Sequence, residues 1–249
     1  AMAYYGISKE ETFDRYLRLA RAYDESPVRT ARILLFDIET LPMHVRVWGL
    51  YKQRIPHTNI VKDWIVLSWA AKWLTEPEMM FGVLTPKEAR QRDDKRICKS
   101  IWSLIDQADI VIAHNGDRFD IRKLNSRFLV LGMNPPSAYR TIDTLKQSQT
   151  VFAHSSNRLD YLGKLKRNEG KIDTNFDLWV RCESGVQEAL DEMIAYNKED
   201  VNLLEEVYLW MRPWMRSHPN LGLYMDLKKP VCAHCGSLNL VNNGYYYAT

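Results

Sequence analysis

The chain has 249 residues, of which 46% are hydrophobic and 26% charged, and these are ordinary values for a globular protein. They exclude a disordered chain and a fibrous repeat, and a chain of this length can bury a core without disulfides or a structural metal. The formal net charge is only +3, so it does not by itself indicate nucleic-acid binding; only local clusters of basic residues could.

No apolar run approaches the roughly 20 residues that cross a bilayer. The N-terminus does not have the basic and then apolar pattern of a signal peptide. The four cysteines are too few for a disulfide scaffold in a chain of this length. We therefore expect a cytoplasmic protein in a reducing compartment, with no membrane partner.

The hydrophobic pattern predicts, in chain order, several strands followed by alternating helices and strands. The expected strands cover residues 33–38, 45–51, 64–74, 79–84 and 109–114, and the expected helices cover 8–26, 87–107, 119–131, 143–149, 159–166 and 186–211. This order indicates an α/β fold with a mixed sheet covered by helices, whose ligand site lies at the carboxyl ends of the strands. We expect an N-terminal helical segment (1–30), a main domain (31–216) and a C-terminal tail (217–249).

Two acids, Asp37 and Glu39, lie two positions apart on the first buried strand. Side chains alternate along a strand, so both should point to one face. Two acids on a buried face need basic partners or a divalent metal. The alternative is that both lie in water at the end of the strand, because Pro42 follows closely, and the two interpretations stay open at this point.

Three further residues suggest a site when they are taken with this pair. Tyr196 and Asp200 are four apart on the long helix and share a face. Asp120 opens the helix after the strand 109–114, with Asp117 as a competitor for the same role. Each acid alone has a structural explanation, such as the preference of helix N-termini for acids. Together they can converge, and oxygen-rich clusters select Mg²⁺ or Mn²⁺ over zinc.

The sequence resembles the DEDD exonucleases of the ribonuclease H-like superfamily, in the subclass with tyrosine in the third motif. The motifs are Phe36-Asp-Ile-Glu-Thr40, His114-Asn-Gly-Asp-Arg-Phe-Asp120 and Tyr196-Asn-Lys-Glu-Asp200. Their order and spacing are similar to those of the proofreading domains of family B DNA polymerases, over residues 33–211. The resemblance implies a ribonuclease H-like mixed sheet flanked by helices, and a 3′–5′ exonuclease that hydrolyses phosphodiester bonds by a two-metal mechanism, with DNA rather than RNA as the expected substrate.

The resemblance also implies roles for the matching residues. Asp37, Glu39, Asp120 and Asp200 would be the ligands of two Mg²⁺ or Mn²⁺ ions, and Tyr196 would orient the attacking water.

Single-stranded 3′ ends are the nucleic-acid partner that the resemblance implies. Thr40, Leu41 and Asn115 are assigned to substrate binding, with Thr40 and Leu41 packed on the terminal nucleotide. Among the basic residues between the second and third motifs, Lys164 and Lys166 are assigned to the phosphate backbone, and a solvated helix face is the alternative.

The C-terminal tail contains Cys232-Ala-His-Cys235, which resembles half of a zinc ribbon. A second Cys-x-x-Cys does not follow, and two ligands rarely suffice, so we expect this chain to hold little zinc. His218 and His234 are the substitute ligands to consider. The segment Ile7-Ser-Lys-Glu-Glu-Thr-Phe13 resembles the recognition helix of a helix-turn-helix, and such flanking DNA-binding pieces would suit a phage or mobile-element protein.

Two rival functions stay open. One is a catalytically inactive nucleic-acid-binding protein of a phage or mobile element, and the intact set of five motif residues argues against it. The other is a ribonuclease H-like endonuclease, and the tyrosine four residues before the last acid favours the exonuclease instead.

Overall fold

The computed structural model describes residues 30–167, 175–226 and 229–241. Residues 31–219 form one compact unit, and a second unit comprises the two ends of the chain, of which residues 30, 220–226 and 229–241 are described. The helix expected over 8–26, and the helix-turn-helix likeness within it, lie outside the described residues. Among the described helices, none is both long enough and apolar enough to cross a membrane.

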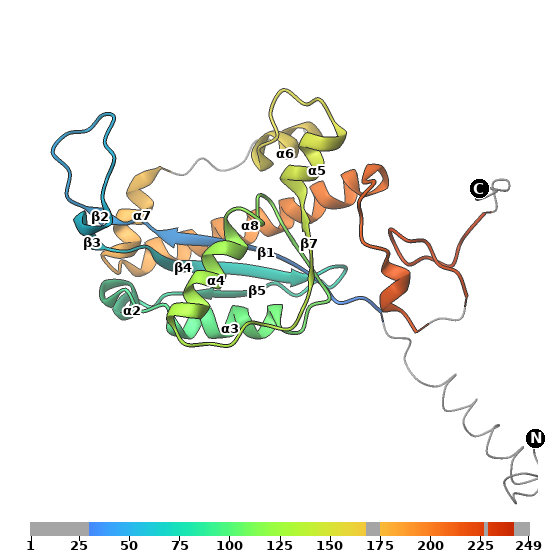
Figure 1. Cartoon of the computed structure of the whole chain (residues 1–249), viewed down its shortest axis with the longest axis horizontal. Helices are drawn as coiled ribbons and strands as arrows, with labels where there is room; N and C mark the ends of the chain where they lie inside the picture. The colour runs from blue at the N-terminus through green and yellow to red at the C-terminus, as the bar shows by residue number, and fades with distance from the viewer. Residues whose placement is uncertain (1–29, 168–174, 227–228, 242–249) are drawn as a thin grey trace, which may run out of the picture. The chain divides into compact units, whose positions relative to one another are not determined.

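A five-stranded mixed sheet lies at the centre of the 31–219 unit, in the order β5-β4-β1-β6-β7 (Figure 1). The strands are β1 (Ile33–Leu41), β4 (Ile65–Trp73), β5 (Met80–Val83), β6 (Ile110–Ala113) and β7 (Arg140–Asp143). β1 is antiparallel to β4 and parallel to β6, and β6 is parallel to β7. β1 and β4 are largely buried, as their continuous apolar runs predict. The mixed-sheet α/β fold expected from the sequence is confirmed.

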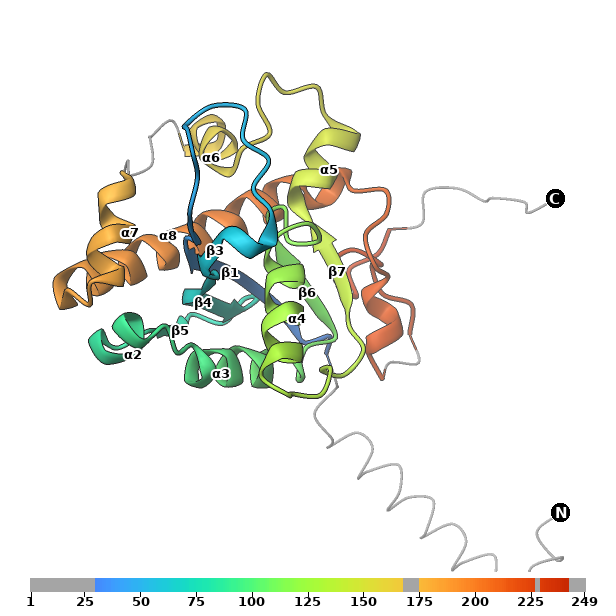
Figure 2. The same ribbon diagram turned by 60° about the vertical axis from the view of Figure 1, so that its left-hand side comes forward.

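Helices cover both faces of this sheet. They are α2 (Pro86–Gln91), α3 (Lys95–Ile105), α4 (Asp120–Val130), α5 (Thr144–Val151), α6 (Leu159–Arg167), α7 (Phe176–Glu183) and α8 (Gln187–Met211). The Ser68 hydroxyl donates to Asn197 of α8, whereas the indole of Trp69 donates to the carbonyl of Ile97 in α3. Neighbouring side chains of a strand point to opposite faces, so α8 and α3 cover opposite faces of the sheet (Figure 2).

The single helix expected over 87–107 is wrong, because the structure has two helices there. Arg92 adopts a left-handed backbone conformation (φ 53°) and ends α2. Asp94 precedes α3, is fully buried and forms a bidentate ion pair with Arg127 of α4, with contacts of 2.6 and 2.7 Å. This tertiary pair fixes the break, and the helical periodicity of the sequence does not reveal it.

The strand expected over 45–51 is also wrong. Only His44–Val45 (β2) is extended, and it pairs with β3 (Ile60–Lys62), while the residues between them form a long loop. The apolar residues Val47, Trp48, Leu50 and Tyr51, which suggested a strand, are exposed in this loop. The strands β3 and β7 were not expected from the sequence.

Candidate active site

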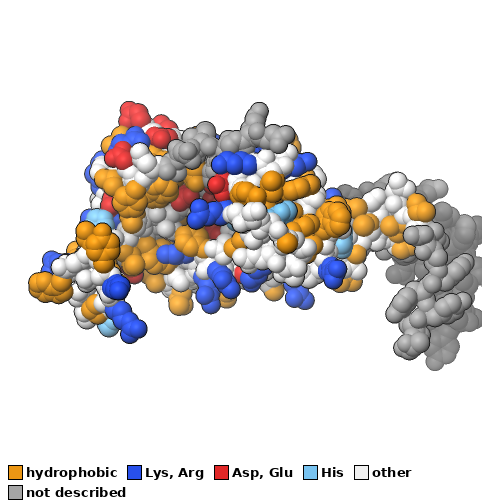
Figure 3. Space-filling model, turned by 90° about the horizontal axis from the view of Figure 1, so that it is seen from above, with side chains coloured by type: hydrophobic (Ala, Val, Ile, Leu, Met, Phe, Trp, Pro, Cys, Tyr) orange, Lys and Arg blue, Asp and Glu red, His pale blue; other side chains and the backbone are white. Residues whose placement is uncertain are grey.

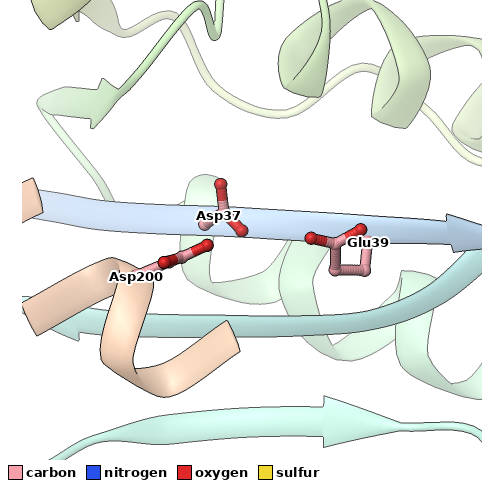
Figure 4. A group of neighbouring side chains, drawn as sticks. All are labelled: Asp37, Glu39 and Asp200. Carbon is pink, nitrogen blue, oxygen red and sulfur yellow. The ribbon is translucent and has the colours of Figure 1, made fainter. Parts of the chain in front are cut away.

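Three of the four predicted carboxylates meet between β1 and α8. Asp37, Glu39 and Asp200 each place one carboxylate oxygen within 4.8 Å of the others (Figure 4). Asp37 and Glu39 share one face of β1 because they are two positions apart, and that face is covered by α8. Asp200 is buried and the other two are half-buried. Of the residues that the structure describes, these form the one group of three that could hold a metal ion.

A buried amide that the sequence analysis missed holds this group in place. Asn197 is fully buried on α8, and its Nδ2 donates to Asp37 Oδ2 at 2.6 Å. Its Oδ1 accepts from the Ser68 hydroxyl of β4 at 3.1 Å. The sequence signal was available, since Asn197 precedes Asp200 by three residues and so lies on the same helix face.

A second polar contact joins α8 to β4 beyond this point. Lys72 of β4 and Glu205 of α8 form an ion pair of 2.6 Å, with side chains that are 11% and 16% exposed. The Ser68–Asn197–Asp37 chain and the Lys72–Glu205 pair lie before and after Asp200 along α8. They therefore fix the helix that carries Asp200 against the two central strands.

The fourth predicted carboxylate, Asp120, contacts the backbone of β1 between Asp37 and Glu39. It is the first residue of α4 and only 2% exposed, and its Oδ1 accepts from the backbone N–H of Ile38 at 3.2 Å. β4 pairs with β1 from Leu34 to Leu41, including Ile38, but β6 pairs with the other edge of β1 only from Ile33 to Leu35. At Ile38 this other edge is met by the carboxylate of Asp120. Asp120 does not belong to the group of three mutually close carboxylates.

Burial raises the pKa of Asp120 to about 7. Hydrogen bonds from the backbone N–H groups of Ile38 and of Asp120 itself oppose this rise, and the nearby charge of Asp143 adds to it. A carboxylate in this condition needs either a proton or a nearby cation at neutral pH. The competitor Asp117 lies differently, because its carboxylate pairs with Lys146 at 2.6 Å.

Asn115 and Asp143 build the turn that brings Asp120 to β1. Asn115 has a left-handed backbone (φ 66°), which asparagine tolerates better than most residues, and its N–H donates to Asp143 Oδ1 at 3.0 Å. Asp143 also accepts from the N–H groups of Leu145 and Lys146 at the start of α5. Asp143 therefore has a structural role, because it joins the turn before α4 to the start of α5.

The other predicted residues after Asp37 and Glu39 have different environments. Thr40 is half-buried and follows a register shift, since Glu39 pairs with Ser68 but Thr40 pairs with Val66. Such irregularities re-aim side chains and are common beside active sites. Leu41 is fully buried in the core, so the structure gives it packing as its role and no surface for a nucleotide.

Tyr196 is half-buried and packs against the hydrophobic core beside Asn197 on α8. Lys164 and Lys166 are exposed on α6. That helix is fixed to α8 by Arg167, whose guanidinium pairs with Glu199 at 2.6 Å and with Glu206 at 2.7 Å. Seen from above, acidic side chains lie in a hollow near the middle of this face, with Lys and Arg side chains beside them (Figure 3).

The candidate zinc ligands of the tail are not assembled into a group of three. Cys232 and His234 are half-buried and Cys235 is exposed, and within the described residues no set of three metal ligands includes them. Both ring nitrogens of His218 have other partners, since Nε2 lies 2.8 Å from the Tyr208 hydroxyl and Nδ1 lies 2.7 Å from the carbonyl of Pro219.

Carboxylates converging between a central strand and a helix, on a mixed sheet of this order, define a nuclease-type hydrolase fold. The chain belongs to the RNase H superfamily, whose family model matches residues 74–212, more than half of the sequence. This range contains Asp120 and Asp200 and begins after β1.

Among solved structures, the chain is similar to the family B DNA polymerase from the hyperthermophilic archaeon Pyrobaculum calidifontis, with a TM-score of 0.53 and 14% identity. The match covers 76% of this chain and 25% of the polymerase, so the chain corresponds to about a quarter of that protein and the likeness concerns the fold. Comparison with curated proteins finds no match.

Proposed function

We propose that this chain is a divalent-metal-dependent 3′–5′ exonuclease that hydrolyses the terminal phosphodiester bond of single-stranded DNA. The observation that carries the proposal is the group of three carboxylates within 4.8 Å, together with Asp120 on the backbone between two of them. A donor set made of carboxylate oxygens suits Mg²⁺ or Mn²⁺ rather than zinc.

Asp37, Glu39, Asp120 and Asp200 would hold two such ions. When bound, the ions would lower the pKa of a water molecule and neutralise charge on the phosphate. Asn197 would keep Asp37 in a fixed orientation, and Tyr196 would orient the attacking water through its hydroxyl. A phenol is a poor base at neutral pH, so orientation rather than proton removal is its proposed role.

The substrate strand would approach along the face that α8 and α6 share. The exposed Lys164 and Lys166 would contact the phosphate backbone, which makes binding sensitive to salt. Thr40, beside Glu39, and Asn115, at the turn before Asp120, are the proposed contacts of the terminal nucleotide.

Digestion of a single-stranded DNA that carries different labels at its 3′ and 5′ ends tests this proposal. In Mg²⁺ or Mn²⁺ the 3′ label should be released first, as a mononucleotide, and EDTA should stop the reaction. A covalently closed circle of the same sequence should survive, because it has no 3′ end. An RNA strand of the same sequence should be hydrolysed more slowly than DNA.

Each alternative gives a different result. Linearisation of the circle, abolished by Asp37→Asn, would identify an endonuclease. Metal-independent binding of the strand without any hydrolysis in Mg²⁺ or Mn²⁺ would identify an inactive nucleic-acid-binding protein.

A further inference from the structure

The loop between β2 and β3, residues 46–59, projects from the body of the 31–219 unit, and we call it the arm (Figures 1 and 2). Its tip carries three highly exposed large apolar side chains close together in sequence, and Trp48 is the most exposed one among the described residues. Trp48 is 99% exposed, Leu50 88% and Tyr51 85%. Exposing a Trp and a Tyr this completely costs hydrophobic free energy, and clustered exposed apolar residues mark binding surfaces.

The charge of the arm is uniform. No Asp or Glu occurs between Glu39 and Asp63, whereas Lys and Arg occur at positions 46, 52, 54 and 62. In a chain whose net charge is only +3, such a stretch is a local excess of positive charge. In Figure 3 the arm projects at the lower left, where hydrophobic and basic side chains lie together. Aromatic rings interleaved with cations are the combination that binds single-stranded nucleic acid, with bases on the rings and phosphates on the cations.

The stem of the arm is fixed to the body, although the tip is exposed. The Arg92 guanidinium donates to the carbonyl of Pro42 at 2.8 Å and to that of Asp63 at 2.7 Å, so it joins the two ends of the β2–β3 segment. Arg92 also pairs with Glu183 of α7, which in turn pairs with His44 at 2.7 Å. A fixed stem reduces the entropy lost when the tip binds.

The arm also lies within reach of the candidate site. Arg46 follows Glu39 by seven residues, so even a fully extended chain places the stem within about 25 Å of Glu39. At the duplex spacing of ~3.4 Å per nucleotide, this distance is that of a strand of about seven nucleotides. Figures 1 and 2 show the arm and α6 rising from the same side of the sheet.

We propose that the arm is a second nucleic-acid contact, which binds the single strand several nucleotides from its 3′ end by stacking bases on Trp48 and Tyr51 and by pairing phosphates with Lys52 and Arg54. The proposal rests on the proposed function for the identity of the substrate. The arm gives affinity for long strands and takes no part in the chemical step.

Comparison of a long with a short substrate tests the arm. The long substrate is a 20-nucleotide single-stranded DNA, and the short one is the p-nitrophenyl ester of thymidine 5′-monophosphate, which cannot reach the arm. Stacking on one aromatic side chain is worth about 5- to 150-fold in affinity, so Trp48→Ala should lower the ratio of kcat/KM on the long to that on the short substrate by about this factor. Trp48→Phe should restore most of the ratio, and Trp48→Leu should not. Leu129→Ala, at an exposed position of α4, is the matched control and should leave the ratio unchanged.

Binding of the same 20-nucleotide strand in EDTA, followed by fluorescence anisotropy, tests the arm separately from catalysis. Here Lys52→Gln with Arg54→Gln should reduce the dependence of log Kd on log salt by about 1.4, the value for two phosphate contacts on a single strand. The outcomes separate the two proposals. If the protein does not hydrolyse DNA but binds it through the arm, the proposed exonuclease function is wrong and the binding role of the arm stands. If hydrolysis is normal and Trp48→Ala leaves the ratio unchanged, the binding role of the arm is wrong and the exonuclease function stands. Equal ratios in Trp48→Phe and Trp48→Leu would show that Trp48 does not stack on a base, and would also contradict the binding role of the arm. The same holds if Trp48→Ala abolishes self-association of the protein but leaves DNA binding unchanged, because the arm would then bind a second copy of the chain.

Discussion

The side-chain amide of Asn197 donates a 2.6 Å hydrogen bond to Asp37, and this contact ties α8 to β1 at the centre of the carboxylate group. Because Asn197 accepts from Ser68 at the same time, its amide has a fixed orientation, with the nitrogen toward Asp37. Residues that hold metal ligands in this way commonly change metal affinity when they are removed.

Asn197→Ala should therefore weaken Mn²⁺ binding by about 10- to 100-fold, because Asp37 loses the donor that orients it. Isothermal titration calorimetry measures this. Ser68→Ala removes only the outer hydrogen bond and is the matched control, with a smaller loss expected. Unchanged Mn²⁺ affinity in Asn197→Ala would mean that the amide serves packing alone.

Asp120 makes the metal-free protein sensitive to pH. Its pKa of about 7 lies above the ordinary value of 3.8, so the folded state binds a proton that the unfolded state has lost between these two values. This contribution to the free energy of unfolding is fully present below pH ~4 and is lost as the pH rises through ~7, with a total of up to about 4 kcal/mol.

Asp120→Asn keeps an oxygen that can accept from Ile38 and needs no proton. In EDTA the variant should be more stable than the original chain at pH 8, and the difference should shrink at pH 5, as measured by urea unfolding. Adding Mg²⁺ at pH 8 should stabilise the original chain and not the variant. A pH-independent difference between the two proteins would show that Asp120 does not titrate in this range.

Tyr196→Phe separates the orientation of water from metal binding. The substitution keeps the packing of the ring against the core and removes only the hydroxyl. Hydrolysis should fall by about 10²- to 10⁴-fold, the range of one positioned group, while Mn²⁺ affinity stays within error. Calorimetry that shows lost Mn²⁺ binding would instead assign Tyr196 to the shape of the site.

Arg92→Ala should loosen the stem of the arm. The substitution removes the guanidinium that donates to the carbonyls of Pro42 and Asp63, and it leaves the mostly buried Glu183 without this ion pair. A hydrogen bond to a charged group typically contributes about 1.5–3 kcal/mol to stability. Trypsin should then cut more rapidly after Lys52 and Arg54. Arg96→Ala, which breaks a more exposed pair with Glu88, is the control. Equal cleavage rates in the two variants would contradict the proposal that the contacts of Arg92 hold the stem.

The stability of the stem should also depend on pH, through the contacts of Glu183 with His44 and Arg92. Burial alone would raise the pKa of Glu183, but hydrogen bonds from His44 and Arg92 and the charge of Arg92 hold the pKa below its ordinary value of 4.5. A lowered pKa stabilises the folded state above about pH 4.5 and loses this effect as the pH falls through the folded value. Trypsin is inactive at low pH, so hydrogen exchange should be measured at the stem of the arm instead. The protection factors, which correct for the intrinsic pH dependence of exchange, should fall only in acid.

The central strand and its acids could be predicted from the sequence because their signal is local. An apolar run with acids two positions apart predicts both the burial of β1 and the shared face of Asp37 and Glu39. The positions of Asp120 and Asp200 followed from the elements that carry them.

The remaining features depend on contacts between distant residues. The break between α2 and α3 depends on Asp94 and Arg127, which are 33 positions apart. Residues 46–51 of the arm were expected in a strand because most of them are apolar, and only the structure shows that Trp48 is exposed. The spacing of Asn197 from Asp200 placed it on the same helix face, but its partners Asp37 and Ser68 lie on distant strands, and only the structure shows these contacts.

The most direct test of the account compares mononucleotide release from the 3′ end of single-stranded DNA, in Mg²⁺, by three variants: Asp200→Asn, Asp120→Asn and Asp117→Asn. Asp200 lies in the carboxylate group and Asp120 on the backbone of β1, whereas Asp117 pairs with Lys146. The account predicts that the first two lose activity by orders of magnitude, because removing a metal ligand dismantles the site, and that Asp117→Asn stays near the rate of the original chain. Near-normal release by Asp200→Asn, or an equal loss in Asp117→Asn and Asp120→Asn, would contradict it.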